Sequence, residues 1–328
     1  MTLIDNFNRR IDYLRISVTD RCNLRCKYCM PACGIANKLH SDLLSFEEIA
    51  KIVRIGVSLG VDKVRLTGGE PLVRKDIVGL VKILANIEGL KDISMTTNGI
   101  LLKNYASQLK KAGLKRLNIS LDTLQEEKYR DITRGGELKE VKEAIKLSLE
   151  AGFHPLKINM LLLAGINEDE IIDFLRLTIN LPIHVRFLEF MPTKNNEFWH
   201  SREDFISYKE VVGISKGLGH VEDIDVHGNG PAKNFRIKHA RGTFGFIAPL
   251  SESFCSSCNR LRLTSDGFLK ACLHSDLKIN LKDPIRRGMD EKSLIQLINL
   301  AVNTKLKEHI LSENPISSSE YLMCQIGG

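Results

Sequence analysis

The chain has 328 residues, of which 43% are hydrophobic and 27% are charged. This length and composition suit one large α/β domain, or one such domain with an appendage, and exclude a minimal module. No apolar run is long enough to span a membrane, and the N-terminal "MTLIDNFNRR" lacks the apolar stretch of a secretory signal. We therefore expect no membrane partner and a cytoplasmic location. The net charge of +7 suits either nucleic acid or a polyanionic small substrate.

Short β-rich runs alternate with longer helical stretches through the first 190 residues. Strands are predicted at 13–19, 63–67, 92–97, 116–121, 156–163 and 184–190. Helices are predicted at 46–60, 76–87, 105–113, 137–152 and 167–179. Three of these helices end in a glycine that suits a left-handed cap, namely Gly60, Gly113 and Gly152. The alternation predicts a parallel sheet, and six βα units rather than eight predict a partial (β/α)6 barrel. An open, doubly wound sheet is the alternative.

The rhythm of strand and helix breaks after residue 190. Residues 226–250 are Gly-rich with short β-like runs, and residues 293–311 are helical in pattern. We expect a partial barrel over 1–230 and a distinct C-terminal region over 231–328.

Three cysteines follow the first predicted strand directly, namely Cys22, Cys26 and Cys29. In α/β folds this end of the strands carries the active site, and clustered thiols in a reducing compartment usually bind metal. Three thiolates leave one metal position open, which suits an iron–sulfur cubane with one free iron. The alternative is a zinc site with Cys33 or His40 as the fourth ligand, although C-x3-C-x2-C is an unusual zinc spacing.

Two further features lie near these cysteines. In "LTGGEPL" after the second strand, Gly68 and Gly69 allow close backbone approach to a ligand and Glu70 offers a carboxylate. Tyr28 lies inside the cysteine loop, where its ring could lie against a flat base. A plain tight turn and loop packing are the alternatives.

A second group of three cysteines occupies the C-terminal region, namely Cys255, Cys258 and Cys272. With His274 as a fourth ligand this group reads as a zinc ribbon, and without it as a second three-cysteine cubane. Zinc would suit a nucleic-acid-binding protein, but no Arg/Lys run with interleaved aromatics accompanies the group.

The segment between these cysteines favours an anion site. In "NRLRLT" strand alternation places Arg260 and Arg262, with Thr264, on the face opposite Leu261 and Leu263. The same alternation recurs in other strands, on whose inner faces we expect Arg15, Ser17, Thr19, Lys157 and Asn159. Basic residues on several strands around one interior would form a cavity for a highly charged anion such as a triphosphate.

The paired motifs resemble the radical S-adenosylmethionine superfamily. The resemblance rests on C-x3-C-x2-C with an aromatic residue before the last cysteine, followed by GGEP after the second strand. It implies a 4Fe–4S cluster whose open iron binds S-adenosylmethionine.

The chain also resembles one family of that superfamily, the GTP 3′,8-cyclases of molybdenum cofactor biosynthesis. The stretches that carry this likeness include "LRISVTDRCNLRCKYCMP", "TTNG", "LNISLDTL", "KINMLLLAGINEDE", "RFLEFMP" and "FCSSCNRLRLTSDGFLKACL". The family resemblance implies hydrogen abstraction from C3′ of GTP and closure of a bond to C8. A radical peptide- or RNA-modifying enzyme with an auxiliary cluster is the alternative.

The resemblance also implies roles for single residues. The first cysteine group would hold the cluster that cleaves S-adenosylmethionine, and the second group would hold a cluster facing GTP. Contacts to S-adenosylmethionine are implied for Tyr28, Gly69, Ser120 and Met191. Contacts to GTP are implied for Arg15, Arg65, Thr96, Lys157, Arg260, Leu261 and Arg262, with Arg186 a further candidate. The catalytic set is Arg15, Arg186, Arg260, Arg262, Gly327 and Gly328.

The terminal "MCQIGG" and the partners complete the expectations. The resemblance implies that Gly327 and Gly328 enter the cavity, where any Cβ would collide. It also implies a low-potential electron donor such as flavodoxin or ferredoxin, and a downstream cyclic pyranopterin monophosphate synthase. A homodimer is compatible with it, and a nucleic-acid partner is not expected. It assigns no role to Cys33 or Cys324.

Overall fold

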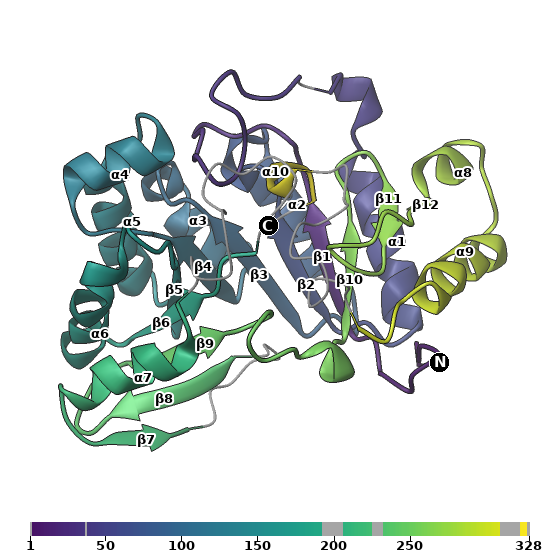
Figure 1. The fold of residues 1–328 in the computed structure, drawn as a ribbon. Coiled ribbons are helices and arrows are strands. Elements are labelled where there is room, and N and C mark those ends of the chain that lie inside the picture. Colours follow the sequence, from purple (N-terminus) through teal and green to yellow (C-terminus); the bar gives the residue numbers. More distant parts are fainter. Residues whose placement is uncertain (1, 37, 192–205, 225–231, 309–321, 327–328) are drawn as a thin grey trace.

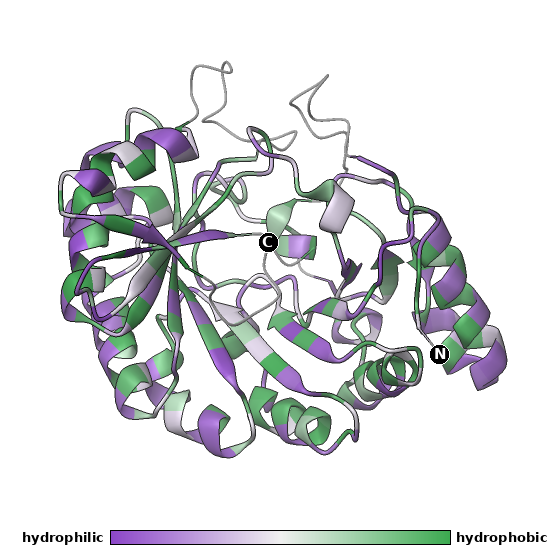
Figure 2. Ribbon diagram, turned by 90° about the horizontal axis from the view of Figure 1, so that it is seen from below, coloured by the Kyte–Doolittle hydropathy of each residue, from purple (hydrophilic) through white to green (hydrophobic). Residues whose placement is uncertain are grey.

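The computed structural model describes residues 2–36, 38–191, 206–224, 232–308 and 322–326. These residues form one curved sheet with helices along its outer side (Figures 1 and 2). In spatial order the strands are β12 (Ile279–Asn280), β11 (Phe268–Lys270), β10 (Arg260–Leu263), β1 (Tyr13–Ser17), β2 (Lys63–Thr67), β3 (Asp92–Thr97), β4 (Arg116–Ser120), β5 (Leu156–Leu161), β6 (Ile183–Leu188), β9 (Thr243–Ile247), β8 (Lys233–Ile237) and β7 (Val221–Asp223).

The order of the first six strands decides between the two expected architectures. A doubly wound sheet reverses its strand order at a switch point, whereas β1 to β6 lie side by side in sequence order and every pair is parallel. The sheet stays open, with β12 and β7 at its edges. The predicted partial (β/α)6 barrel is therefore confirmed, and the doubly wound alternative is wrong.

Strands from the C-terminal part extend this sheet at both edges. β10 pairs in parallel with β1, and β9 pairs in parallel with β6. The remaining strands add antiparallel hairpins outside them. Strands from both sides of the expected boundary at residue 230 thus belong to one sheet. No local sequence pattern could predict that the C-terminal strands pair with β1 and β6.

The helices largely follow the predicted runs. They are α1 (Phe46–Ser58), α2 (Ile77–Ala85), α3 (Ala106–Lys111), α4 (Glu126–Thr133), α5 (Leu138–Glu150), α6 (Ile171–Asn180), α7 (Tyr208–Lys216), α8 (Lys282–Arg286), α9 (Glu291–Asn303) and α10 (Met323–Ile326). The three glycines expected as helix caps have φ angles of 96°, 104° and 80°, in the left-handed region that favours glycine. α4 and α7 were not expected, and the helix expected over 293–311 ends at Asn303, before Lys305.

Strand alternation separates an apolar outer face from a polar inner face. On β1, Leu14 and Ile16 join the hydrophobic core beneath the helices, and Leu261 does so on β10. Arg15 lies between them and lines the interior of the arc. The core therefore holds the sheet while its inner face remains available for a ligand.

Candidate active site

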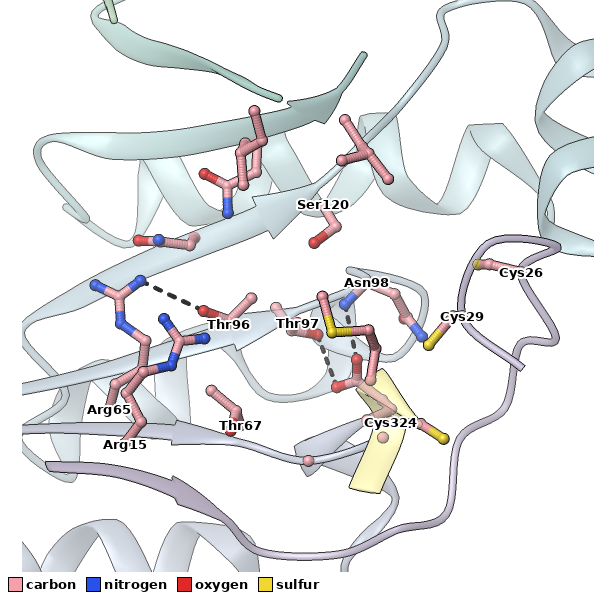
Figure 3. Close-up of a pocket in the computed structure, with 18 of the residues that line it drawn as sticks. Arg15, Cys26, Cys29, Arg65, Thr67, Thr96, Thr97, Asn98, Ser120 and Cys324 are labelled. Carbon is pink, nitrogen blue, oxygen red and sulfur yellow. Dashed lines mark hydrogen bonds between the residues drawn. The ribbon is translucent and has the colours of Figure 1, made fainter. Parts of the chain in front are cut away.

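One large pocket occupies the inside of the arc. It is lined by inner-face side chains of β1 to β6 and β10, by the loops that follow these strands, and by Met323 and Cys324 of α10. Figure 3 shows Arg15 and Arg65 toward one end of this pocket and Cys26 and Cys29 toward the other.

The first cysteine group lines this pocket with all three thiols. The Cys22 sulfur accepts hydrogen bonds from the backbone N–H of Leu24, at 3.4 Å, and from the Asn98 side chain, at 3.8 Å. Among the described residues no three His, Cys, Asp or Glu side chains converge as they would around one metal ion. The three cysteines that line the cavity would suit the donor set of a cubane with one free iron.

Tyr28 ties the cysteine loop to the end of β4. Its hydroxyl donates a hydrogen bond to Asp122 Oδ2 at 2.6 Å. Burial raises the pKa of Asp122 to about 6, against the opposing effect of this hydrogen bond and of the Leu161 backbone N–H. Tyr28 faces the pocket as expected, and its hydroxyl partner, which the sequence did not indicate, fixes the ring in place.

The segment "GGEP" packs against the backbone of the cysteine loop. Gly69 donates its N–H to Thr19 O at 2.8 Å, and Glu70 donates to Arg21 O at 2.8 Å. The buried Glu70 carboxylate then accepts from Thr97 Oγ1 and from the Asn98 backbone N–H, each at 2.7 Å. Burial raises the pKa of Glu70 to about 7, although these hydrogen bonds oppose the shift. This motif therefore braces the cysteine loop as well as lining the pocket.

We expect Gly69→Ala to distort the loop that carries the first cysteine group. An alanine Cβ at this position would lie 2.3 Å from Arg21 O and 2.7 Å from Asp20 O, and both atoms are backbone. Such overpacking costs about 1–3 kcal/mol of stability. Thermal unfolding and iron content after reconstitution should both fall. Gly213→Ala is the matched control, because nothing lies within 4 Å of the added methyl and the residue is inside α7. Equal behaviour of the two variants would contradict the packing argument.

Cations gather at the opposite end of the pocket. The pocket-lining cations here are Arg15, Lys63, Arg65, Arg116, Arg186 and Arg260. Arg116 is paired with Asp92, whereas no described carboxylate pairs with Arg65, Arg186 or Arg260. Arg65 donates instead to Ser94 Oγ at 3.2 Å and to Thr96 Oγ1 at 3.5 Å (Figure 3).

Burial and neighbouring cations lower the pKa values of Arg186 and Lys157 at this end of the cavity. Burial, followed by the charge of Arg65, lowers the pKa of Arg186 to about 9. Burial, followed by Arg186 and Arg116, lowers the pKa of Lys157 to about 6. The Nε atoms of Arg186 and Arg260 are buried without a hydrogen-bond acceptor among the described residues. Buried donors that lack acceptors are costly, so this end of the cavity is built to receive an anion.

The predicted GTP contacts divide into two sets. Arg15, Arg65, Thr96, Arg186 and Arg260 line the pocket as expected. Lys157, Leu261 and Arg262 do not.

The three residues outside the pocket lining occupy different positions. Lys157 is 1% exposed, paired in register with Asn118 on the same inner face. The Leu261 side chain belongs to the core, so only its backbone could reach a ligand. Arg262 donates to Ile326 O of α10 at 3.3 Å. The predicted direct contact of Arg262 side chain with the pocket is thus replaced by a contact with the C-terminal segment.

All four residues expected to contact S-adenosylmethionine line the same pocket as the first cysteine group. They are Tyr28, Gly69, Ser120 and Met191. Each of them lies at the end of a different strand or in the loop after it, namely β1, β2, β4 and β6. The order of the strands in the sheet therefore brings them together.

The second cysteine group lies at the far end of β1 from the first. Cys258 precedes Arg260, which pairs with Tyr13 at the start of β1, whereas Cys22 follows its end. β11 returns antiparallel to β10, with Lys270 opposite Arg262, and so brings Cys272 back toward Cys258. Five strand residues span about 16 Å, so the two groups flank the cavity from opposite ends.

The environment of Cys258 is cationic. Burial acts to raise the pKa of Cys258, but the charges of Lys305 and Arg260 outweigh it and lower that pKa. A thiolate is the form that binds iron, so the surroundings suit a metal ligand.

The C-terminal segment reaches the pocket, as the resemblance implied for it. Met323 and Cys324 line the pocket, and a hydrogen bond with Cys324, together with burial, raises the pKa of Cys29. Gly327 and Gly328 lie outside the described residues. Cys33 is exposed and is not one of the residues that line the pocket.

Several pocket residues were not predicted. Asn98, Asn118, Asp122, Glu189 and Cys324 belong to this set. Asn118 and Glu189 lie within predicted strands, and Asn98 and Asp122 directly follow predicted strands, so position and alternation could have found them. Cys324 had no such signal, because it reaches the pocket through a segment far away in sequence.

Comparisons with known proteins agree with this geometry. Residues 16–178 match the radical SAM superfamily, and residues 183–311 match Molybdenum Cofactor Synthesis C. The GTP 3′,8-cyclase of Petrotoga mobilis is 50% identical over 99% of this chain and 100% of its own length. Those of Moorella thermoacetica and Alkaliphilus metalliredigens are 49% and 47% identical over 99% of both chains. This chain belongs to the GTP 3′,8-cyclase family. It is therefore a radical S-adenosylmethionine enzyme of the first step of molybdenum cofactor biosynthesis, as the motifs predicted.

Solved structures support the fold of this family member. Streptococcus suis SuiB bound to S-adenosylmethionine superposes with a TM-score of 0.60 at 17% identity, covering 89% of this chain and 69% of SuiB. Family membership implies a 4Fe–4S cluster and S-adenosylmethionine, and it removes the nucleic-acid-binding and the peptide- or RNA-modifying readings of the whole protein. No helix among the described residues is long and apolar enough to cross a membrane.

Proposed function

We propose that this chain cyclises GTP to 3′,8-cyclo-7,8-dihydroguanosine 5′-triphosphate inside the cavity that lies between its two cysteine groups. The observation that carries this proposal is the division of one cavity, with three cysteines at one end and, at the other, Arg186 and Arg260, whose Nε atoms lack an acceptor among the described residues. A substrate with several negative charges would satisfy those arginines while its ribose points toward the thiol end.

The thiol end is proposed to bind the cluster and S-adenosylmethionine. Cys22, Cys26 and Cys29 would hold the cluster, and Tyr28, Gly69, Ser120 and Met191 would contact S-adenosylmethionine. When bound there, the cluster and S-adenosylmethionine would supply the one-electron chemistry that removes a hydrogen atom from C3′ of GTP. The chain would hold the reacting groups in position and exclude water from them. The hydrogen bond to Asp122 fixes Tyr28, and the hydrogen bonds of Glu70 hold the cysteine loop. Correct placement of a reacting carbon is worth several orders of magnitude in rate.

The cationic end is proposed to bind GTP. Arg15, Arg65, Arg186 and Arg260 would contact the triphosphate or the base, with Thr96 beside Arg65. Arginine suits this task because its planar guanidinium recognises an anion with two parallel hydrogen bonds. Lys157 and Arg262 lie outside the pocket lining and would act indirectly. Lys157 would act through its charge, and Arg262 through its hydrogen bond to the C-terminal segment.

The second cysteine group is proposed to hold a second 4Fe–4S cluster beside GTP. Cys258 lies two residues before Arg260, and Arg260 lines the cavity. Three thiolates leave one iron open for a substrate atom. A low-potential donor of the flavodoxin or ferredoxin class would supply electrons, and a cyclic pyranopterin monophosphate synthase would consume the product.

Anaerobic reconstitution tests this proposal. Iron near eight atoms per chain, brown colour and GTP-dependent formation of the cyclised nucleotide are expected with S-adenosylmethionine and a reductant. Iron near four atoms with zinc in the second group, or turnover that ignores GTP, would overturn it.

We expect Arg260→Met to weaken GTP binding while leaving the fold intact. Its guanidinium faces the cavity, and its loss removes a charge-assisted hydrogen bond of about 1.5–3 kcal/mol, which is at least about tenfold in affinity. Arg241→Met is the matched control, since Arg241 is exposed and its guanidinium donates to a backbone carbonyl, that of Asn180, at 3.2 Å. Calorimetric affinity should separate the two variants and melting temperature should not. A lower melting temperature with unchanged affinity would mean that Arg260 supports the fold instead.

The depressed pKa of Lys157 predicts proton uptake when GTP binds. With a pKa of about 6, Lys157 is mostly neutral at pH 7.5 in the free protein. A bound polyanion favours its ammonium form, so binding takes up a proton and affinity falls as pH rises above about 6. Calorimetry at pH 7.5 in buffers of different ionisation enthalpy should find up to one proton fewer taken up by Lys157→Met than by the parent. An equal proton count in both proteins would contradict this reading.

A further inference from the structure

Two buried cations lie behind the second cysteine group, and the proposed chemistry uses neither. Lys305 is 5% exposed and Arg9 is 7% exposed. Lys305 follows α9, and Arg9 belongs to the N-terminal segment before β1. The sequence patterns singled out neither residue.

Lys305 connects both segments that carry the cysteines. Its ammonium donates to Arg260 O at 3.0 Å and to Ala271 O at 2.8 Å. Arg260 follows Cys258 by two residues, and Ala271 immediately precedes Cys272. Two donors of this one lysine therefore bind backbone carbonyls beside two of the three cysteines.

Arg9 fixes the first cysteine of the group in a similar way. It donates to Cys255 O at 2.7 Å, and to Leu306 O and Lys307 O at 2.7 and 3.0 Å. The buried Asp5 carboxylate holds this guanidinium in place. Arg9 thus joins the Cys255 loop to the segment that follows Lys305.

We propose that Lys305 is a positioning residue for the second cluster, which holds the backbone beside Cys258 and Cys272 and raises the reduction potential of that cluster through its buried positive charge. This proposal rests on the proposed second cluster at Cys255, Cys258 and Cys272. Hydrogen bonds to ligand sulfurs and nearby charge are two of the factors that set such potentials. A fixed positive charge stabilises the reduced cluster, which carries one more negative charge than the oxidised cluster. Because Lys305 is buried, this effect is weakly screened by solvent.

The test uses the full chain with Cys22, Cys26 and Cys29 replaced by Ala, so that the only cluster signal comes from the second group. In this background Lys305→Met and Lys305→Gln remove the charge, and Gln retains donors for a backbone carbonyl. Lys292→Met is the matched control, because it removes the same charge from an exposed position on α9. The readouts are the iron content and the midpoint potential of the cluster. Electron paramagnetic resonance monitors the reduced cluster during the redox titration.

The charge-removing variants should have a lower midpoint potential. We expect the ratio of reduced to oxidised cluster at a fixed solution potential to fall about tenfold, which is about 59 mV for a one-electron couple. Lys292→Met should keep the potential of the parent. If Lys305→Met loses its iron and Lys305→Gln retains it at a lower potential, the proposal stands. An unchanged potential in a variant that holds the cluster, or loss of iron from both variants, would overturn it. Absence of a second cluster from the parent itself would instead contradict the proposed function.

Discussion

Cys22→Ala should abolish cleavage of S-adenosylmethionine, whereas Cys255→Ala should leave cleavage measurable and abolish cyclisation of GTP. The reason is the separation of the two cysteine groups by the length of β1. Cys22 faces the end of the pocket shared with Tyr28 and Gly69, and Cys255 does not line that pocket. Loss of one group therefore leaves the residues around the other in place.

The measurement is the yield of 5′-deoxyadenosine and of cyclised nucleotide per chain after anaerobic reconstitution. Cys33→Ala is the matched control, because Cys33 is exposed and lies only four residues after Cys29. It should retain both yields. Equal loss of cleavage in Cys22→Ala and Cys255→Ala would mean that the second group is needed for the fold, and the division of labour would be wrong.

Deleting Gly327 and Gly328 should cut GTP cyclisation by about 100-fold while both clusters survive. α10 leads directly to these residues and already lines the pocket with Met323 and Cys324. Arg262 holds its last carbonyl, that of Ile326, at 3.3 Å. Displacement of reacting groups by about 1 Å can cost this much in rate. Glycines have no Cβ, so they suit a filled site.

A comparison of the deletion with Gly327→Ala and Gly328→Ala separates side-chain collision from loss of the segment. If collision matters, the Ala variants should resemble the deletion in product yield while iron content and cleavage of S-adenosylmethionine stay at the parent level. Native rates of cyclisation in the deletion variant would show that these two residues have no part in the reaction.

Sequence reasoning succeeded where the signal is local. The alternation of polar and apolar residues around Arg15 predicted that this side chain lies on the inner face of the sheet. The positions of the glycines at helix ends predicted left-handed φ angles there. The alternation of strands and helices predicted that the first six strands pair in sequence order. The parallel pairing of β10 with β1 and of β9 with β6 joins residues more than 50 positions apart, and only the folded core selects it.

The candidate site shows the same division. Motif spacing placed Cys22, Cys26 and Cys29 in one pocket, because a short loop holds them together. The same reasoning put Arg262 in the cavity, whereas its guanidinium reaches the C-terminal segment. The positions of Cys324 and Lys305 depend on contacts with segments far away in sequence, for which periodicity carries no information.

Hydrogen transfer from GTP tests the central claim most directly. GTP labelled with deuterium at C3′ should be incubated with the reconstituted protein, S-adenosylmethionine and a reductant. If GTP binds in the cationic end with its ribose toward the first cysteine group, 5′-deoxyadenosine should carry one deuterium by mass spectrometry and the cyclised nucleotide should lose it. Formation of the cyclised nucleotide together with 5′-deoxyadenosine that carries no deuterium would contradict the account.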